Sequence, residues 1–387
     1  MKKSLFVVVL LAVIVALAAF AVAPTALAEE TLITGAKAAY LTDGMGEMVL
    51  YEYHATDRYP IASMVKIMTA LLSFEEIERG EMSLDETLIV SSEAMGMGGS
   101  QMFLQEGDAY PVSDLLKGVI VVSANDACVA LAERIAGSEE AFVVRMNERA
   151  KELSMTNTHF ANCTGLPHPE GYSCAKDVAT MLRELIKHPD YHRFSNIWLE
   201  DYTHPDGRVT TMTNTNKLVR FYQGCVGGKT GYTAEAGFCL AAAAQRQGVD
   251  AVSVVIGMKD SKARFAASTT LLNHAFACLK STPLAVAGEE LTLAPVKQGK
   301  QRFVPATVAE TLALVTRKGE EARGRVEYRY FSPKAPLQAG DKVGEAYLVA
   351  DGIVKARTDL IALAPVDKGD WGDAIEEFLG HYPLRWN

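Results

Sequence analysis

The stretch that decides the fold is RYPIASMVKIMTA, residues 58–70. Apolar residues recur through it at helical spacing, so the sequence predicts a helix over residues 63–80 that ends at Gly80. Residues three apart stand on one face of a helix. Ser63 and Lys66 therefore place an amine beside a hydroxyl.

This pair has the chemistry of an activated nucleophile. A serine hydroxyl attacks poorly until a base removes its proton. A lysine is a base only when it is neutral, and burial or a nearby positive charge, such as that of Lys229, lowers its pKa. The helix dipole would also favour negative charge at Ser63. Ser-x-x-Lys is common by chance, however, and a second copy at Ser173–Lys176 is predicted to be a capping serine followed by a solvent-facing lysine.

A second motif, Ser123-Ala124-Asn125, follows the apolar run 118–122 and opens a predicted helix. Ser123 could relay a proton toward a leaving amine. Asn125 offers a donor and an acceptor that suit a substrate amide. The alternative is simple helix capping, which both residue types favour.

A third motif, Lys229-Thr230-Gly231, lies on a predicted strand. Such a strand can bind an extended peptide by backbone pairing, and Gly231 leaves room for close approach. Lys229 and Thr230 point to opposite faces, and we assign Lys229 to the cleft, where its charge suits a substrate carboxylate. The backbone N–H groups of Ser63 and Tyr232 would form the oxyanion hole. The alternative is an exposed strand lysine near a turn.

Charge and composition narrow the possible functions. The chain has 387 residues, about half of them apolar, and a net charge of −9. It contains no basic run and no aromatic–basic patch, which argues against nucleic acid as a partner.

The N-terminus is predicted to direct export. Two lysines precede the apolar stretch 5–23, and Ala26-Leu27-Ala28 fits a cleavage site, so residues 1–28 are interpreted as a signal peptide. An uncleaved membrane anchor is the alternative, because the apolar stretch is about as long as a bilayer core requires. Either way we expect the folded part outside the cytoplasm.

The order of predicted elements indicates an α+β fold. Strands are expected at 36–41, 47–53, 226–233, 237–244 and 252–258. Helices are expected at 111–122, 125–136, 138–153, 175–187 and 264–279. Strands from both ends of this region with helices between them predict an antiparallel sheet flanked by helices, in a domain spanning residues 29–282.

A second, smaller domain is predicted to follow a boundary at Ser281-Thr282-Pro283. Residues 283–370 show short β runs at 312–316, 325–331, 343–349 and 360–364, which favour a small all-β, sandwich-like domain.

The tail, residues 371–387, is amphipathic. Its apolar helical face could contact a membrane surface peripherally, but its polar face carries Asp373, Glu376 and Glu377, where an interfacial helix usually has basic residues. Docking on the protein itself is the alternative.

Six cysteines remain in the part expected to be exported, and the sequence does not choose among their possible pairings. We interpret them as small buried thiols. Their spacing matches no metal site, and the predicted chemistry requires no metal and no cofactor.

The three motifs, in this order, resemble those of penicillin-binding proteins and class A β-lactamases. The surrounding residues are similar to the serine D-alanyl-D-alanine carboxypeptidases, the low-molecular-mass penicillin-binding proteins. Further matching segments are Gly99–Leu104, Asn162–Leu166, Asn214–Leu218 and Lys229–Thr233. The likeness covers roughly residues 31–280, and the β domain also fits this family, whose members often end in an amphipathic membrane helix.

The resemblance implies a β-lactamase/transpeptidase-like fold and a role for each catalytic residue. Ser63 would form the acyl-enzyme, Lys66 would activate it and Ser123 would shuttle protons. The substrate would be the peptidoglycan stem pentapeptide, which loses its terminal D-Ala. Penicillins would acylate Ser63 as covalent inhibitors.

The resemblance also implies the substrate-binding residues. Asn125 would hold the peptide, and Lys229 would bind the terminal carboxylate within a cleft wall that also contains Thr230, Gly231 and Tyr232. Arg264 could assist with that carboxylate, although its match is looser and a surface arginine is the alternative.

Two residues depart from the family pattern, and we expect them to affect the rate of the reaction rather than its type. Val65 stands where the family usually has threonine, and Ala124 stands where this subgroup usually has glycine.

Three alternatives remain at this point. A β-lactamase would use a glutamate and a positioned water for deacylation, and the expected Glu-x-x-Leu-Asn segment is missing. D,D-endopeptidase or transpeptidase activity would share the site. A non-catalytic penicillin-sensing or wall-binding protein would keep the same fold.

Overall fold

The structure is a computed structural model that describes residues 32–370. The predicted signal peptide and the predicted amphipathic tail lie outside the described residues.

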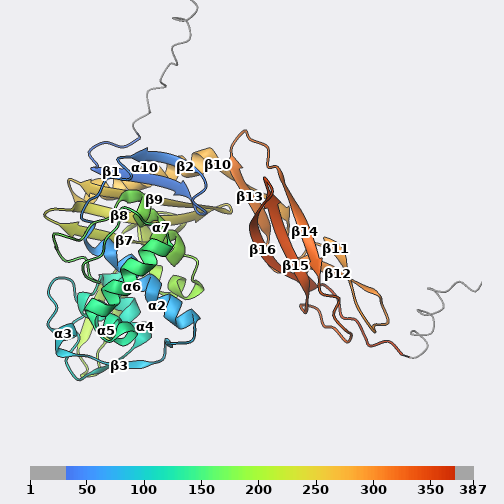
Figure 1. Cartoon of the computed structure of the whole chain (residues 1–387), viewed down its shortest axis with the longest axis horizontal. Coiled ribbons are helices and arrows are strands. Elements are labelled where there is room, and N and C mark those ends of the chain that lie inside the picture. Colours follow the sequence, from blue (N-terminus) through green and yellow to red (C-terminus); the bar gives the residue numbers. More distant parts are fainter. Residues whose placement is uncertain (1–31, 371–387) are drawn as a thin grey trace, which may run out of the picture. The chain divides into compact units, whose positions relative to one another are not determined.

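The larger part of the chain is organised by an antiparallel sheet of five strands in the order β2-β1-β9-β8-β7 (Figure 1). These are β1 (Ala38–Asp43), β2 (Val49–Tyr53), β7 (Cys225–Thr233), β8 (Gly237–Arg246) and β9 (Val249–Met258). The first and last strands of the region pair directly, with Tyr40 opposite Val254. The predicted antiparallel sheet is confirmed, and β7, the strand with the Lys-Thr-Gly motif, lies at its edge.

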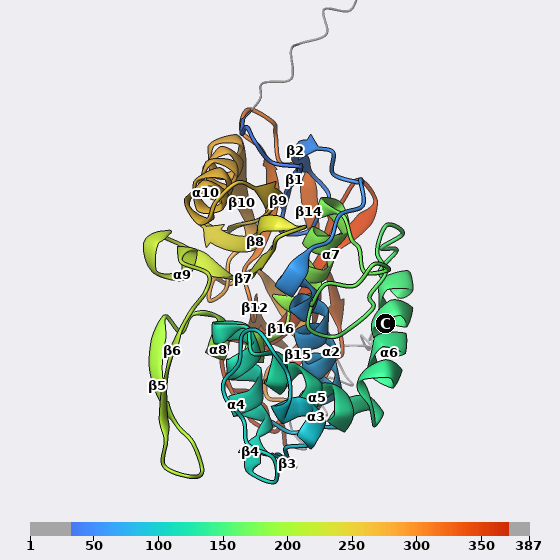
Figure 2. The ribbon, with the colours of Figure 1, turned by 90° about the vertical axis from the view of Figure 1, so that its left-hand side faces the viewer.

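Helices cover the sheet and build a lobe beside it (Figure 2). The longer helices are α2 (Lys66–Glu78), α5 (Asn125–Ala136), α6 (Glu139–Glu152), α7 (Ala175–Leu185) and α10 (Ser261–Cys278). Helices α7 and α10 pack on the sheet, and α2 packs against both α7 and α5. The predicted helices are found, so the α+β class is confirmed.

Short elements complete this region. The short helices are α3 (Ser92–Met95), α4 (Val112–Lys117), α8 (His192–Ser195) and α9 (Leu218–Phe221). Single helical turns are η1 (Ala62–Val65), η2 (Gly118–Val122) and η3 (Pro189–Tyr191). Two small hairpins pair β3 (Thr87–Ile89) with β4 (Ala109–Pro111), and β5 (Leu199–Thr203) with β6 (Val209–Thr213).

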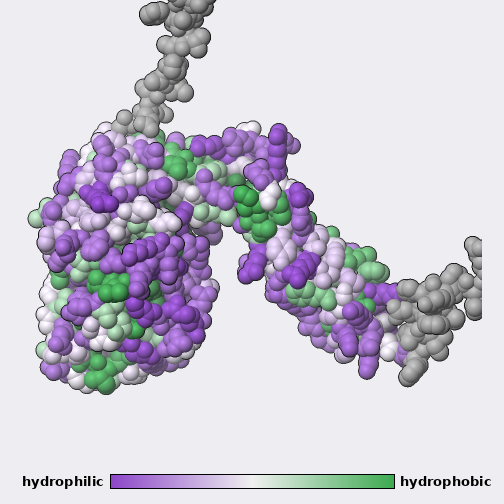
Figure 3. Space-filling view, in the orientation of Figure 1, coloured by the Kyte–Doolittle hydropathy of each residue, from purple (hydrophilic) through white to green (hydrophobic). Residues whose placement is uncertain are grey.

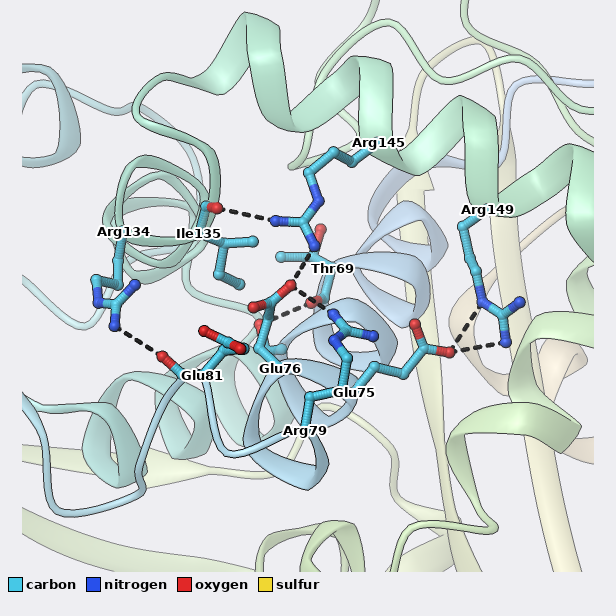
Figure 4. A network of polar contacts seen from close by, with 10 residues as sticks. Thr69, Glu75, Glu76, Arg79, Glu81, Arg134, Ile135, Arg145 and Arg149 are labelled. Carbon is cyan, nitrogen blue, oxygen red and sulfur yellow. Dashed lines mark hydrogen bonds and ion pairs between the residues drawn. The ribbon is translucent and has the colours of Figure 1, made fainter.

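A polar network joins the far ends of the helices that carry the first two motifs (Figure 4). Glu76, near the end of α2, is buried and forms ion pairs with Arg79 and with Arg145 of α6. Arg145 also donates to the carbonyl of Ile135 in the last turn of α5 at 2.9 Å. One guanidinium therefore joins α2, α5 and α6.

The C-terminal part is all β, as predicted. A five-stranded antiparallel sheet runs β11-β12-β16-β15-β14, and a two-stranded sheet pairs β10 with β13. Their bounds are β10 (Leu279–Ala285), β11 (Thr292–Pro295), β12 (Phe303–Val308), β13 (Leu312–Arg317), β14 (Gly324–Tyr330), β15 (Lys342–Ala350) and β16 (Ile353–Ala362). Strand β10 runs across the predicted boundary at residue 282.

Two local expectations are settled by side-chain contacts. Ser173 does not cap α7; the N-cap is Cys174, whose sulfur accepts from the backbone of Asp177, while the Ser173 hydroxyl contacts Thr158. The capping prediction for Ser173 was therefore wrong, whereas Lys176 faces solvent as predicted.

All six cysteines are unpaired, and four of them are buried. The interpretation of most of them as buried thiols is confirmed. Within residues 32–370, no helix combines the length and the apolar character needed to cross a bilayer.

Candidate active site

The nucleophile motif begins in a strained turn rather than inside the helix. Ser63 lies in η1, just before α2 begins at Lys66. Ala62, immediately before it, has a φ of 49°, a left-handed conformation that is costly for a residue with a side chain. The turn leaves Ser63 partly exposed while its neighbours Ala62 and Met64 are buried. Ser63 is thus the partly exposed residue of an otherwise buried segment.

Lys66 is buried against that hydroxyl. Its side chain is only 1% exposed, and its Nζ lies 3.1 Å from Ser63 Oγ. The amine also donates to the carbonyl of Thr164. Burial lowers the pKa of Lys66, although weaker influences from Cys128, Cys163 and Asp126 oppose the shift. The structure thus places a buried amine with a lowered pKa beside the serine hydroxyl.

The loop that supplies the Thr164 carbonyl is fixed by one side chain. Asn162 Oδ1 accepts from the backbone N–H groups of Thr164 and Gly165. Gly165 packs so closely that an added Cβ would lie 2.1 Å from the carbonyl oxygen of Ala62. The loop therefore contacts both Lys66 and residues 61–64, which we call the nucleophile turn.

The second motif joins η2 to α5. Ser123 adopts a left-handed backbone conformation, with a φ of 66°, and it does not cap α5, whose N-cap is Ala124 without a side-chain bond. Its buried hydroxyl has no hydrogen-bond partner among the described residues. Asn125 donates to the carbonyl of Gly98 at 2.6 Å. The capping alternative is wrong for both residues, and the Ser123 hydroxyl is left for another partner.

A neighbouring carboxylate holds the loop that faces this motif. Asp126 accepts from the backbone N–H groups of Met102 and Leu104. The backbone N–H of Asn125 donates to the carbonyl of Ser100 at 2.7 Å. Ala124 has a φ of −60°, so alanine fits where glycine is usual in the family.

The third motif brings β7 against the nucleophile turn. A Cβ added at Gly231 would lie 2.6 Å from the Ile61 carbonyl oxygen and 3.3 Å from the Met64 nitrogen. The close approach predicted for Gly231 is thus made to the chain's own nucleophile turn. Thr230 is buried and Tyr232 is exposed on the same strand.

Lys229 lies close enough to Lys66 for their charges to interact. It is 4% exposed, and its Nζ donates to the carbonyl of Thr230 at 3.1 Å. Burial lowers the pKa of Lys229 well below its usual value, and the positive charges of Lys66 and Arg264 lower it further. The exposed-lysine alternative is therefore wrong.

Arg264 is buried too, so the surface-arginine alternative is also wrong. Its guanidinium donates to the carbonyl of Gly231 at 3.1 Å and to that of Cys239 at 3.3 Å. It therefore ties the start of α10 to the strand of the third motif.

The fold agrees with the comparisons to known proteins. The sequence profile of the family described as D-alanyl-D-alanine carboxypeptidase, Peptidase S11, matches residues 25–260. The chain belongs to this family. A second profile, described as the C-terminal domain of penicillin-binding protein 5, matches residues 280–368.

Individual relatives match nearly the whole chain. D-alanyl-D-alanine carboxypeptidase DacF of Bacillus subtilis is 38% identical over 350 residues, covering 90% of each chain. DacC of Escherichia coli is 31% identical, covering 93% of this chain and 92% of the relative. The crystal structure of penicillin-binding protein 5 from Haemophilus influenzae has a TM-score of 0.63 and 29% identity, covering 86% of this chain and 98% of the other.

One solved relative is named for a different activity. A mutant of the Streptomyces K15 DD-transpeptidase is 28% identical with a TM-score of 0.59, covering 63% of this chain and 98% of the other.

Several residues of the site were not predicted from the sequence. Asn162 and Asp126 were not given roles, although each holds a loop through two backbone N–H groups. The Thr164 carbonyl that contacts Lys66 belongs to the backbone and leaves no sequence signal. The turn chemistry of an asparagine just before Thr164-Gly165 could have indicated Asn162. Among residues 32–370, no group of histidine, cysteine or acidic side chains is arranged to hold a metal ion.

Proposed function

We propose that the chain is a serine D,D-carboxypeptidase that removes the terminal D-Ala from peptidoglycan stem pentapeptides. The observation that carries this assignment is the buried Lys66 amine 3.1 Å from Ser63 Oγ. A neutral lysine at this distance can take the serine proton. Membership of the D-alanyl-D-alanine carboxypeptidase family supports the substrate.

The acylation step follows from the positions of the groups. Lys66 takes the proton of Ser63, and Oγ attacks the carbonyl carbon of the penultimate D-Ala. The backbone N–H groups of Ser63 and Tyr232 stabilise the resulting oxyanion. The unpaired hydroxyl of Ser123 relays a proton to the leaving amine, and terminal D-Ala departs. Water then hydrolyses the ester and releases the shortened stem.

Substrate binding and base activation are coupled in this scheme. Two buried ammonium groups repel each other, so Lys66 and Lys229 do not both hold a proton easily. The terminal carboxylate of the substrate favours the protonated form of Lys229, and that charge in turn favours a neutral Lys66. Arg264 adds positive charge beside Lys229, while Asn125, Thr230 and Gly231 align the peptide.

β-Lactams would acylate the same serine, and the chain would act outside the cytoplasm. Cleavage after Ala28 would release a mature chain that begins at Glu29, as the A-x-A pattern predicts. The tail would provide peripheral contact with the outer face of the cytoplasmic membrane. The substrate and the exported location agree, because peptidoglycan stems are built into the wall there.

The assignment is tested with a synthetic peptide ending in Lys-D-Ala-D-Ala and with a fluorescent penicillin. The wild type should release D-Ala and should hold bound penicillin for long periods. Ser63→Ala should abolish both activities. Rapid turnover of penicillin without D-Ala release would instead identify a β-lactamase, and labelling without D-Ala release would identify a penicillin sensor.

The matched control is the second Ser-x-x-Lys copy. Lys176→Ala removes an exposed lysine from that copy and should leave D-Ala release unchanged. Addition of an amine acceptor tests the remaining choice, because a transpeptidase would join the acyl group to the amine and a carboxypeptidase would continue to form the free acid.

A further inference from the structure

One end of the C-terminal five-stranded sheet gathers basic side chains from three separate segments. Lys297 lies in the hairpin loop between β11 and β12, and its backbone forms an isolated parallel β-bridge with Lys334. Gly299, in the same loop, forms an isolated antiparallel β-bridge with Lys368. The backbone N–H of Gly369 donates to the carbonyl of Gln298 at 2.8 Å. These contacts place the three segments side by side.

We call this the basic end, and it consists of Lys297, Lys300, Arg302, Lys334 and Lys368. All five residues are exposed. Within residues 32–370 the only ion pair they form is a long one, 3.9 Å between Lys300 Nζ and Asp367, both of which are well exposed. The three segments also carry two acidic residues, Asp367 and Asp370, so the basic end keeps an excess of positive charge.

Apolar side chains adjoin these cations on the β11–β12 hairpin. Leu293 and Phe303 are each 52% exposed, while their strand neighbours Ala294 and Val304 are fully buried. Because side chains alternate across a strand, Leu293 and Phe303 lie on the outer face of the hairpin, as do Pro295 and Pro305, which pair with them in the register. The hairpin therefore joins an exposed apolar face to a basic loop.

The chain leaves the domain at this same end. Asp370 is the last described residue, and seventeen residues follow it. Their sequence contains Trp371, Ile375 and Phe378, and its charged residues are three acidic ones, Asp373, Glu376 and Glu377, and one basic one, Arg385. A segment with this negative balance can supply apolar anchors but not the excess of positive charge that attracts anionic lipids. The basic end has that charge.

We propose that the basic end of the β domain binds the surface of an anionic phospholipid membrane and works together with the tail. Lysines and arginines near such a surface are attracted to its negative potential, and clusters of four to eight recur at these sites. Leu293 and Phe303 would enter the interface, as apolar residues beside basic ones do in interfacial segments. The proposal goes beyond the peptidase activity and does not depend on it.

The test measures binding of the complete exported chain to sedimenting vesicles. Vesicles of phosphatidylcholine with about a third phosphatidylglycerol are compared with vesicles of pure phosphatidylcholine. We expect the chain to bind the anionic vesicles more than about tenfold better, with the difference shrinking as salt rises. The triple variant K297E/K334E/K368E should lose at least about tenfold in binding to the anionic vesicles.

The matched control is R323E/R325E/R357E, which makes the same change in net charge at exposed arginines elsewhere in the domain. This variant should bind almost as well as the wild type. L293S/F303S should weaken binding at high salt, where the charge contribution is screened. Unchanged penicillin acylation and an unchanged melting temperature verify that each variant is folded.

Three results would overturn the proposal. The first is equal vesicle binding by the wild type and K297E/K334E/K368E. The second is equal loss in the control variant, which would indicate a response to net charge alone. The third is charge-dependent binding to a purified anionic wall polymer without binding to vesicles, which would assign the basic end to the wall.

Discussion

Lys66 must be neutral to act as a base, so its protonation should control acylation. Burial lowers its pKa from the ordinary lysine value of 10.5. Its neutral fraction therefore rises as pH increases through a value below 10.5, and the rate of penicillin acylation should rise with it. The rate should fall again at higher pH, where Lys229, whose pKa is also lowered by burial, loses the charge that binds the carboxylate. Stopped-flow measurement of acylation between about pH 5 and pH 10 tests this expectation. A rate that does not depend on pH would contradict the role of Lys66.

Replacing the base should cost far more activity than replacing an exposed lysine. Lys66→Ala should slow acylation by about 10²-fold to 10⁴-fold, which is the usual contribution of a positioned general base. Lys176→Ala, at the exposed second copy of the motif, should have the wild-type rate. Comparable losses of acylation rate in the two variants would contradict the role of Lys66 as the base.

Gly231 should be required for the packing of β7 on the nucleophile turn. In Gly231→Ala, the new Cβ would meet the Ile61 carbonyl oxygen at 2.6 Å, so the strand or the turn must shift. We expect at least about a 10²-fold loss in the rate of D-Ala release, as small misplacements of reacting groups cause. Gly171→Ala is the matched control. A Cβ added there would lie 3.5 Å from its nearest neighbour, the carbonyl oxygen of His168, which is an ordinary contact distance. Normal activity in Gly231→Ala would mean that the contact is not needed.

At the scale of single residues, the chemistry of the side chains made much of the site predictable. Contacts between residues far apart in the sequence were not predictable. The Ser63–Lys66 contact was predicted from helical spacing, although Ser63 lies in the η1 turn just before α2. The contact between Lys66 and the Thr164 carbonyl spans 98 positions and involves a backbone atom, so no local pattern reveals it. Ser173 shows the opposite error, since a residue type common at helix starts was outcompeted by Cys174 one position later.

At the scale of elements, the ion pairs of Glu76 are expected to hold α2 against α5 and α6. Burial opposes ionisation of Glu76, but its bonds to Arg145 and Arg79 outweigh that effect and lower its pKa. A lowered carboxyl pKa contributes stability at neutral pH that is lost as pH falls through the folded-state value. Glu76→Gln should therefore reduce the free energy of unfolding by about 2 kcal/mol at pH 7, and by less in acid.

Urea unfolding at pH 7 and pH 4 measures this difference. Glu148→Gln, an exposed position on α6, provides the control and should change the free energy of unfolding by less than about 0.5 kcal/mol. Equal effects of the two substitutions, or an effect of Glu76→Gln that does not depend on pH, would contradict the role of the network.

The long elements of the fold were predictable because periodicity marks them clearly. Helix α5 begins and ends where its apolar pattern predicted, at Asn125 and Ala136. The β5–β6 hairpin and strands β11 and β12 were not predicted. These strands are short, with only four residues in β11, and they are stabilised by partners in the sheet more than by a local pattern.

At the scale of the whole molecule, all six thiols, four of which are buried, should stay reduced. Burial raises the pKa of Cys128 and of Cys174 to about 12, which leaves these thiols protonated and unreactive. Thiol titration of the denatured, freshly secreted protein should find six free thiols, and intact mass should place the N-terminus at Glu29. A disulfide, or a mass that includes residues 1–28, would contradict these expectations.

Acylation of Ser63 is tested by mass spectrometry of the protein after a short exposure to penicillin. We expect one covalent adduct per chain, located at Ser63 by peptide mapping, and none in Ser63→Ala. An adduct at any other residue, or one that persists in Ser63→Ala, would contradict it.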